Sequence, residues 1–244
     1  MDYKIVLDSC GELTYKMKES GIYHTAVLSM LVDGDTILDD ESFDRKDFLK
    51  RVAVSPECPK SSCPSPDAYM ELYGGAEKRV YVVTLSAELS GSYNSAQLGK
   101  ELWNEENEDG DKQIYVVIEH VEAYIEEQHT YFVLENLDTL RKNGRLTGIK
   151  SLMASALNIK PVMGSTPEGT ICQLGQARGV KKAIAKMAEH IVADGKNTEN
   201  KVLAIAHCNC PERAREIERM ILDKIKVKDS FIVETGGIST MYAN

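Results

Sequence analysis

The feature that most constrains the fold is a repeated alternation of short β-branched apolar runs with longer stretches of helical periodicity. The clearest run is RVYVVTL at Arg79–Leu85, and similar runs lie at Tyr3–Leu7, Gln113–Ile118 and Val202–Ala206. Bounded runs of this composition predict buried strands. Pro211–Ile225 instead places apolar residues on one helical face. Alternation of strands with helices predicts parallel sheets with right-handed crossovers.

Further elements follow from local signals. Asp33-Gly34 between two apolar runs predicts a hairpin, and Ser65-Pro66 supplies the cap and first residue of a helix. Additional strands are predicted at Thr25–Val32, Asp35–Leu38, Ile159–Met163, Thr170–Leu174 and Phe231–Val233, and a loop at Pro56–Pro66. Helices are predicted at Asp44–Val52, Tyr93–Asn104, His120–Glu127, Thr130–Arg141, Leu152–Leu157 and Val180–Ala193.

These elements predict an α/β protein of two lobes, each a largely parallel sheet flanked by helices. The stretch RKNGRLTGIK at Arg141–Lys150 has two glycines and little apolar content, so we place the boundary there. The expected domains are an N-terminal lobe over residues 1–145 and a C-terminal lobe over residues 146–244.

Composition narrows the class of protein. With 43% apolar residues among 244, the chain can bury a core. A net charge of -9 argues against nucleic acid as a partner. No apolar run is long enough for a transmembrane helix, and the N-terminus does not resemble a signal peptide. We therefore expect a cytoplasmic protein.

The cysteines do not have the spacing of a zinc site. Cys208 and Cys210 form a C-x-C pair beside His207, and Cys58 and Cys63 are five residues apart. Neither pattern matches the C-x2-C spacing of common zinc motifs. We expect free thiols, with no metal and no cofactor.

Three polar clusters follow predicted strands or precede predicted helices. They are Asp8-Ser9, the turn that ends in Ser90-Gly91-Ser92, and Ser61-Ser62 in the proline loop. Helix N-termini offer free N–H groups, serine adds an O–H donor, and glycine permits close approach of a ligand. The serine clusters thus predict a site for a small anion, although capping and turn formation are the commoner roles of serine.

Several motifs together resemble the DegV family. They are P-K-S-S-C-P-S-P at Pro59–Pro66, T-L-S-A-E-L-S-G-S-Y-N-S-A at Thr84–Ala96, H-T-Y-F-V-L-E-N-L-D-T-L-R-K-N-G-R at His129–Arg145, L-N-I-K-P-V at Leu157–Val162 and R-G-V-K-K-A-I at Arg178–Ile184. The resemblance runs from Lys4 to the C-terminus. One departure is that the family usually has a further helical segment where Ile118 is followed directly by Glu119.

The resemblance implies a long-chain fatty acid bound between the two lobes, with its acyl chain in an apolar tunnel. The carboxylate would be held by Ser61, where the family more often has threonine, and by Ser90 with the Gly91 backbone; Ser62 and Ser92 lie beside them. Family members that serve fatty-acid kinases present this carboxylate to a separate ATP-dependent subunit. Arg178 matches an arginine linked to that role, so it is a candidate ligand-binding residue that acts on the carboxylate or on the partner. The chain alone would then not be an enzyme.

Two alternatives remain open at the level of the sequence. A hydrolase or transferase with a serine nucleophile would need a base, and none of the five histidines lies in a recognisable triad context. The second alternative is a binding module for another small anion. The absence of a P-loop or a G-x-G-x-x-G motif argues against nucleotides.

Overall fold

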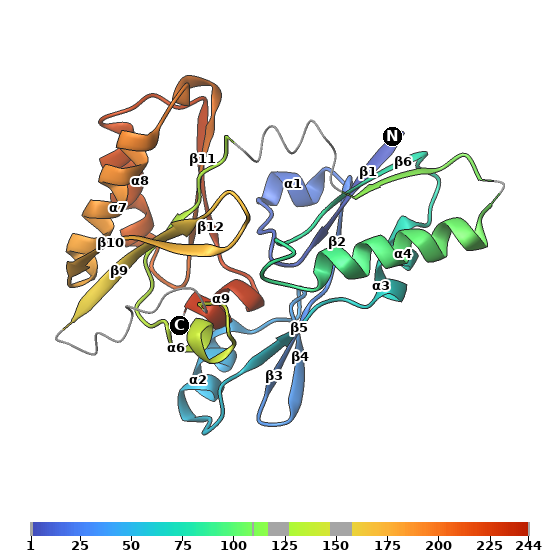
Figure 1. Ribbon diagram of the computed structural model, residues 1–244, viewed down its shortest axis with the longest axis horizontal. Helices are drawn as coiled ribbons and strands as arrows, with labels where there is room; N and C mark the ends of the chain where they lie inside the picture. The colour runs from blue at the N-terminus through green and yellow to red at the C-terminus, as the bar shows by residue number, and fades with distance from the viewer. Residues whose placement is uncertain (1, 109, 117–126, 147–157, 244) are drawn as a thin grey trace. The chain divides into compact units, whose positions relative to one another are not determined.

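The computed structural model describes residues 2–108, 110–116, 127–146 and 158–243 (Figure 1). The chain divides into two compact units. Unit 1 comprises Met1–Gln128 with Gly236–Ile238, and unit 2 comprises His129–Thr235 with Ser239–Asn244. Residues 129–145, assigned to the N-terminal lobe from the sequence, therefore group with unit 2. The reason is that strand β8 (Tyr131–Phe132) pairs with a strand of unit 2.

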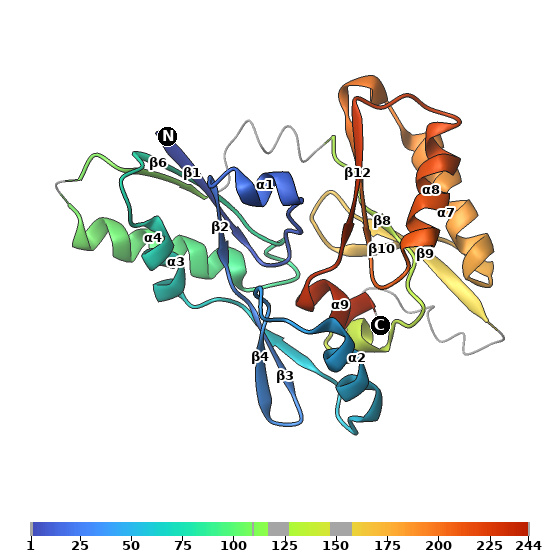
Figure 2. The same ribbon diagram turned by 180° about the vertical axis from the view of Figure 1, so that it is seen from behind.

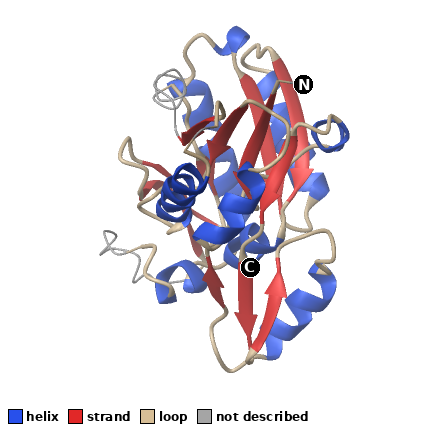
Figure 3. Ribbon diagram, turned by 90° about the vertical axis from the view of Figure 1, so that its right-hand side faces the viewer, coloured by secondary structure: helices blue, strands red, loops and turns tan. Residues whose placement is uncertain are grey.

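A parallel sheet organises unit 1. It consists of β1 (Tyr3–Asp8), β2 (Tyr23–Ala26), β6 (Arg79–Val83) and β7 (Gln113–Val116) in the order β2-β1-β6-β7. All three pairings are parallel. The predicted α/β class, with parallel strands flanked by helices, is confirmed, and Figure 3 shows helices and strands throughout the described chain.

Two helices cover one face of this sheet. They are α3 (Pro66–Tyr73) and α4 (Ser92–Glu106), which lie side by side in both views (Figures 1 and 2). Helix α3 begins as predicted, since the Ser65 hydroxyl accepts a hydrogen bond from the N–H of Ala68 at 3.2 Å. The core between helices and sheet contains Val6, Ala26, Tyr69, Tyr73, Val80, Val82, Ala96, Ile114 and Val116.

A small antiparallel sheet of unit 1 corrects two predictions. Its strands are β3 (Ser29–Val32), β4 (Asp35–Leu38) and β5 (Lys60–Ser62). The single strand predicted at Thr25–Val32 is wrong: it is divided into β2 and β3, and between them the N–H of Leu28 donates to the Ser9 hydroxyl at 3.1 Å. The proline loop is also not all loop, because β5 pairs with β3. Strands that form by distant pairing leave little local signal.

The hairpin and the first long helix agree with the sequence. Asp33 and Gly34 have φ values of 50° and 85°, as a hairpin turn between β3 and β4 requires. Helix α2 (Arg45–Val54) is capped by Asp44. A short helix, α1 (Tyr15–Glu19), was not predicted.

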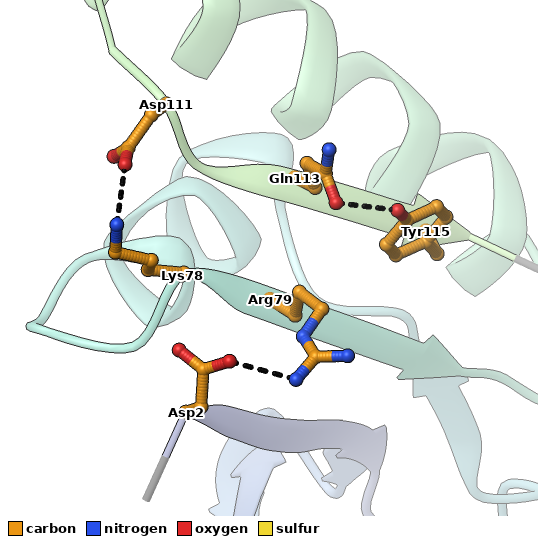
Figure 4. Close-up of polar contacts among 6 residues, drawn as sticks. All are labelled: Asp2, Lys78, Arg79, Asp111, Gln113 and Tyr115. Carbon is orange, nitrogen blue, oxygen red and sulfur yellow. Dashed lines mark hydrogen bonds and ion pairs between the residues drawn. The ribbon is translucent and has the colours of Figure 1, made fainter.

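Polar pairs lie near the first residues of strands in the parallel sheet (Figure 4). Arg79 pairs with Asp2 at 2.7 Å, Lys78 with Asp111 at 2.8 Å, and the Tyr115 hydroxyl donates to Gln113 at 2.7 Å. These groups are largely exposed, and exposed ion pairs contribute about 0–1 kcal/mol each. They therefore contribute little to stability.

Unit 2 contains two sheets. Strands β8, β9 (Ile159–Ser165) and β10 (Ile171–Arg178) are antiparallel, and β11 (Val202–His207) pairs in parallel with β12 (Asp229–Glu234). The helical elements are α6 (Asp138–Lys142), α7 (Val180–Asp194), the 3-10 turn η1 (Thr198–Asn200) and α8 (Pro211–Leu222), and α9 (Gly237–Ala243) follows β12. The core of unit 2 contains Ala183, Ile184, Met187, Ile217 and Ile221.

The helix predicted at Thr130–Arg141 is wrong. This stretch forms β8 and the short α6, because Tyr131 and Phe132 pair with Gly164 and Met163 of β9. Three features named from the sequence lie outside the described residues. They are the predicted helix at Leu152–Leu157, nearly all of the predicted helix at His120–Glu127, and the departure from the family after Ile118.

Close packing of α3 on α4 generates a stability prediction. A Cβ atom on Gly99 would lie 2.6 Å from the Pro66 carbonyl oxygen and 3.1 Å from Tyr69 Cβ. Helix propensity alone favours alanine over glycine by about 1 kcal/mol, but overpacking against backbone costs about 1–3 kcal/mol. We expect Gly99→Ala to lower the free energy of unfolding, measured by urea denaturation. The exposed Asn94→Ala in the same helix is the control and should change little; equal or greater stability of Gly99→Ala would contradict the close contact.

Candidate functional site

A buried carboxylate marks the carboxyl end of β1. Asp8 is 2% exposed, and it accepts hydrogen bonds from the N–H groups of Leu85 at 2.7 Å and Cys10 at 3.3 Å. Burial raises its pKa above the ordinary range, although these N–H bonds and the Ser92 hydroxyl act to lower it. None of the ion pairs among the described residues includes Asp8. The carboxylate is thus held by dipoles rather than by a cation.

The second element of the site is the turn between β6 and α4. The turn contains a backbone hydrogen bond of its own, in which the Ser90 N–H donates to the Ser86 carbonyl at 3.0 Å. The Ser90 hydroxyl donates to Ser92 Oγ at 3.3 Å and accepts from the Ser92 N–H at 3.2 Å. Ser92 is fully buried, Ser90 is half-buried and Gly91 is exposed. The turn therefore presents Ser90 and Gly91 at the surface of unit 1 with Ser92 beneath them.

The third element is β5 and the residues that follow it. Ser61 pairs in register with Met30 and is half-buried, whereas Ser62 pairs with Ser29 and is exposed. Because side chains alternate along a strand, Ser61 and Ser62 point to opposite faces.

Cys63 brings the two serine segments together. A Cβ on Gly91 would lie 3.0 Å from the Cys63 sulfur, and this sulfur lies 3.8 Å from Ser95 Oγ in the first turn of α4. The end of β5 is thus packed against the start of α4. The structure places both predicted serine segments at one end of unit 1, and Gly91 allows their close approach.

Sequence reasoning did not identify Tyr69 as part of this region. It lies on the apolar face of α3, and its hydroxyl is buried and has no hydrogen-bond partner within the described ranges. Burial and the Asp8 carboxylate raise its pKa above the ordinary value. A tyrosine in an apolar periodic pattern gives no sequence signal that separates it from a core residue.

Arg178 belongs to unit 2. It is the last residue of β10, is exposed, and precedes Gly179, whose φ of 81° turns the chain into α7. Arg178 makes no ion pair within the part of the chain that the structure describes.

Other candidate features lie elsewhere. A cavity of about 410 Å³ is lined by Trp103, Asn107 and Lys112 among others, at the C-terminal end of α4 and so opposite the serine turn. The six cysteines lie in the described ranges and form no disulfide, and the described residues contain no group of three or more His, Cys, Asp or Glu side chains arranged to hold a metal. None of the described helices combines the length and apolar character that a membrane span requires.

Comparison with solved structures finds close relatives. A protein from Ruminococcus gnavus, whose structure is described with vaccenic acid, is 54% identical, with a TM-score of 0.95 over 100% of this chain and 97% of the other. The Streptococcus pneumoniae Fatty Acid Kinase (Fak) B3 protein, loaded with linoleic acid, is 28% identical, with a TM-score of 0.83 over 100% and 96% of the two chains.

Sequence comparison agrees. A DegV domain-containing protein of Streptococcus pyogenes serotype M3 is 31% identical over 277 residues, which cover 100% of this chain and 96% of the relative. The family model described as "Uncharacterised protein, DegV family" matches residues 2–117 and 105–243. Since these two matches together span nearly the whole chain, the protein belongs to the DegV family.

Proposed function

We propose that this chain binds a long-chain fatty acid. Ser61 and the Ser90-Gly91 turn hold the carboxylate, with Ser62 and Ser92 beside them, and an apolar tunnel holds the acyl chain. The observation that carries the proposal is the contact of Cys63 with Gly91 and Ser95, which puts two hydroxyl-bearing segments next to each other. The fatty acids in the R. gnavus and S. pneumoniae relatives support it.

The two parts of such a ligand contribute differently. Burial of each CH2 group stabilises the complex by about 0.8 kcal/mol, so a long chain dominates the affinity. Hydrogen bonds to a charged group give only about 1.5–3 kcal/mol each. The serine hydroxyls therefore mainly orient the carboxylate, and they do so without a cation.

The second part of the proposal is that the chain presents its bound fatty acid to a kinase. A carboxylate held at the surface by Ser90 and Gly91 is accessible to a second protein. Such a partner would be an ATP-dependent fatty-acid kinase subunit that forms the acyl phosphate. Exposed Arg178, with no ion pair in the described ranges, is available to an acidic surface of this partner.

The direct test is identification of the ligand. Protein purified from its own host, denatured and extracted, should release a long-chain fatty acid that mass spectrometry detects in near-equimolar amount. Protein that carries none and also fails to take up a labelled fatty acid would reject the proposal. Recovery of a phosphate ester or a small carboxylate would instead favour the alternative of another anion.

A serine nucleophile is the remaining alternative. Neither Ser90 nor Ser92 makes a hydrogen bond to a histidine among the described residues, so no serine–histidine pair supports it there. Labelling of the protein by a fluorophosphonate probe would restore this alternative.

Removal of the two hydroxyls tests the proposed carboxylate site. We expect Ser61→Ala with Ser90→Ala to weaken fatty-acid binding in isothermal titration calorimetry, by about 1.5–3 kcal/mol for each hydrogen bond lost. Ser65→Ala is the matched control. It removes the cap of α3 and should lower stability by about 0.5–2 kcal/mol while leaving affinity unchanged. Unaltered affinity of the double variant would place the carboxylate elsewhere.

Arg178→Ala separates binding from presentation. The variant should retain wild-type fatty-acid affinity, because in this proposal Arg178 faces the kinase subunit and not the carboxylate. In an assay with the kinase subunit and ATP, its acyl-phosphate formation should fall about tenfold, as expected for loss of roughly 1.4 kcal/mol of interaction. Arg178→Lys keeps the charge and should recover part of the activity. A loss of fatty-acid affinity in Arg178→Ala would contradict the partner role.

A further inference from the structure

A second buried carboxylate of unit 1 lies outside the serine turn. Asp39 directly follows β4 and is 6% exposed. Its oxygens accept hydrogen bonds from the N–H of Gly237 and, at 3.1 Å, from the N–H of Ile238, the first two residues of α9. Without these donors the carboxylate would be buried and unsatisfied, which is costly. Asp39 therefore holds the start of α9 firmly, from a position 198 residues earlier in the chain.

The segment that Asp39 holds is a short return of the chain to unit 1. Residues Gly236–Ile238, here called the returning segment, belong to unit 1, whereas the residues on either side of them belong to unit 2. A Cβ atom on Gly237 would lie 2.7 Å from Asp39 Oδ1. Glycine at this position therefore permits the close approach of the backbone to the carboxylate.

Met30 connects the returning segment to the serine site. A Cβ atom on Gly237 would overlap the Met30 methyl group, so these two residues are in direct contact. Met30 is fully buried and pairs across the strands with Ser61 of β5. Residues directly opposite each other on antiparallel strands share one face, with Cβ atoms about 4.5–5.5 Å apart. Met30 thus contacts the returning segment and also lies beside Ser61.

The main chain of Asp39 is attached to the same sheet. Its N–H donates to the Leu28 carbonyl at 3.0 Å, immediately before β3 begins. The first residue of β3, Ser29, pairs with Ser62, the last residue of β5. Asp39 therefore joins the serine-bearing end of the small sheet to the returning segment, the former through its backbone and the latter through its side chain.

We propose that Asp39 is a positioning residue of the serine site. By holding Gly237 against Met30, it keeps Met30 packed beside Ser61 and so constrains the hydroxyl that meets the ligand carboxylate. Methionine has three rotatable bonds and adapts to any space left open, so release of Gly237 would let the Met30 side chain move. Asp39 itself does not touch the ligand. This inference rests on the proposed function and adds a residue that acts through Ser61.

Asp39→Ala and Asp44→Ala form a matched pair, since each removes a carboxylate that caps a helix. Asp44 is exposed and accepts from the Asp47 N–H at 3.0 Å at the start of α2. Both variants should melt at a lower temperature. Affinity for vaccenic acid, measured by isothermal titration calorimetry on folded, delipidated protein, should fall roughly three- to tenfold in Asp39→Ala only. This is part of the loss expected from removing the Ser61 hydroxyl itself.

Two further variants test the contact with the returning segment. Asp39→Asn keeps one acceptor oxygen and should recover part of the affinity. Gly237→Ala disturbs the same contact from the opposite side, so it should weaken binding as Asp39→Ala does. The double variant should bind no more weakly than the weaker of the two single variants. Should Asp39→Ala fail to fold, Asp39→Asn and Gly237→Ala provide the same comparison with Asp44→Ala.

A second cycle tests the route through Ser61. In a Ser61→Ala background, Asp39→Ala should have no further effect on affinity, whereas a general loss of stability would act in this background as well. Wild-type affinity of folded Asp39→Ala, or an equal loss in the Ser61→Ala background, would overturn the inference while leaving fatty-acid binding intact. If the wild-type protein itself binds neither vaccenic acid nor other long-chain fatty acids, the proposed function is rejected, and this role with it.

Discussion

The Asp8 carboxylate is the constraint on which unit 1 depends most. Its bond from the Leu85 N–H joins the end of β1 to the chain leaving β6, and that chain continues into the Ser90 turn and α4. A buried carboxylate without a cation is costly unless N–H and O–H groups satisfy it. The chain meets this requirement by directing backbone N–H groups and the Ser92 hydroxyl at Asp8.

A site made of hydroxyl and backbone groups recognises anions differently from a site made of cationic side chains. Arginine or lysine beside the turn would bind many anions strongly, whatever group carried the charge. Serine and glycine give weaker, directional contacts, so affinity must come from elsewhere in the ligand. The proposed division follows from this: the serine turn selects and orients a carboxylate, and burial of the acyl chain supplies the strength. Vaccenic and linoleic acids, the acids named with two of the relatives, both combine a carboxylate with a long acyl chain.

The sequence predicted well those elements that depend on local chemistry. The Ser65-Pro66 start of α3 and the apolar run of β6 are correct, since capping and β-branched composition act within a few residues. Elements that depend on distant pairing were missed. β5 forms within a proline-rich stretch only because β3 offers its edge, and β8 replaces a predicted helix because β9 lies beside it. The proximity of Ser61 and Ser90 was expected only from the resemblance to the DegV family, and the contact through Cys63 that produces it could not be predicted from local signals.

Tyr69 illustrates the limit of a periodic pattern. On α3 it and Tyr73 are both fully buried one helical turn apart, and periodicity does not distinguish them. They differ only in what lies opposite each hydroxyl: a carbonyl of α4 for Tyr73, and the Asp8 and Ser92 cluster for Tyr69. A phenylalanine would fill the same volume without an unpaired polar atom. Periodicity therefore identifies Tyr69 only as a core residue, and only the surroundings of each hydroxyl in the folded chain separate Tyr69 from Tyr73.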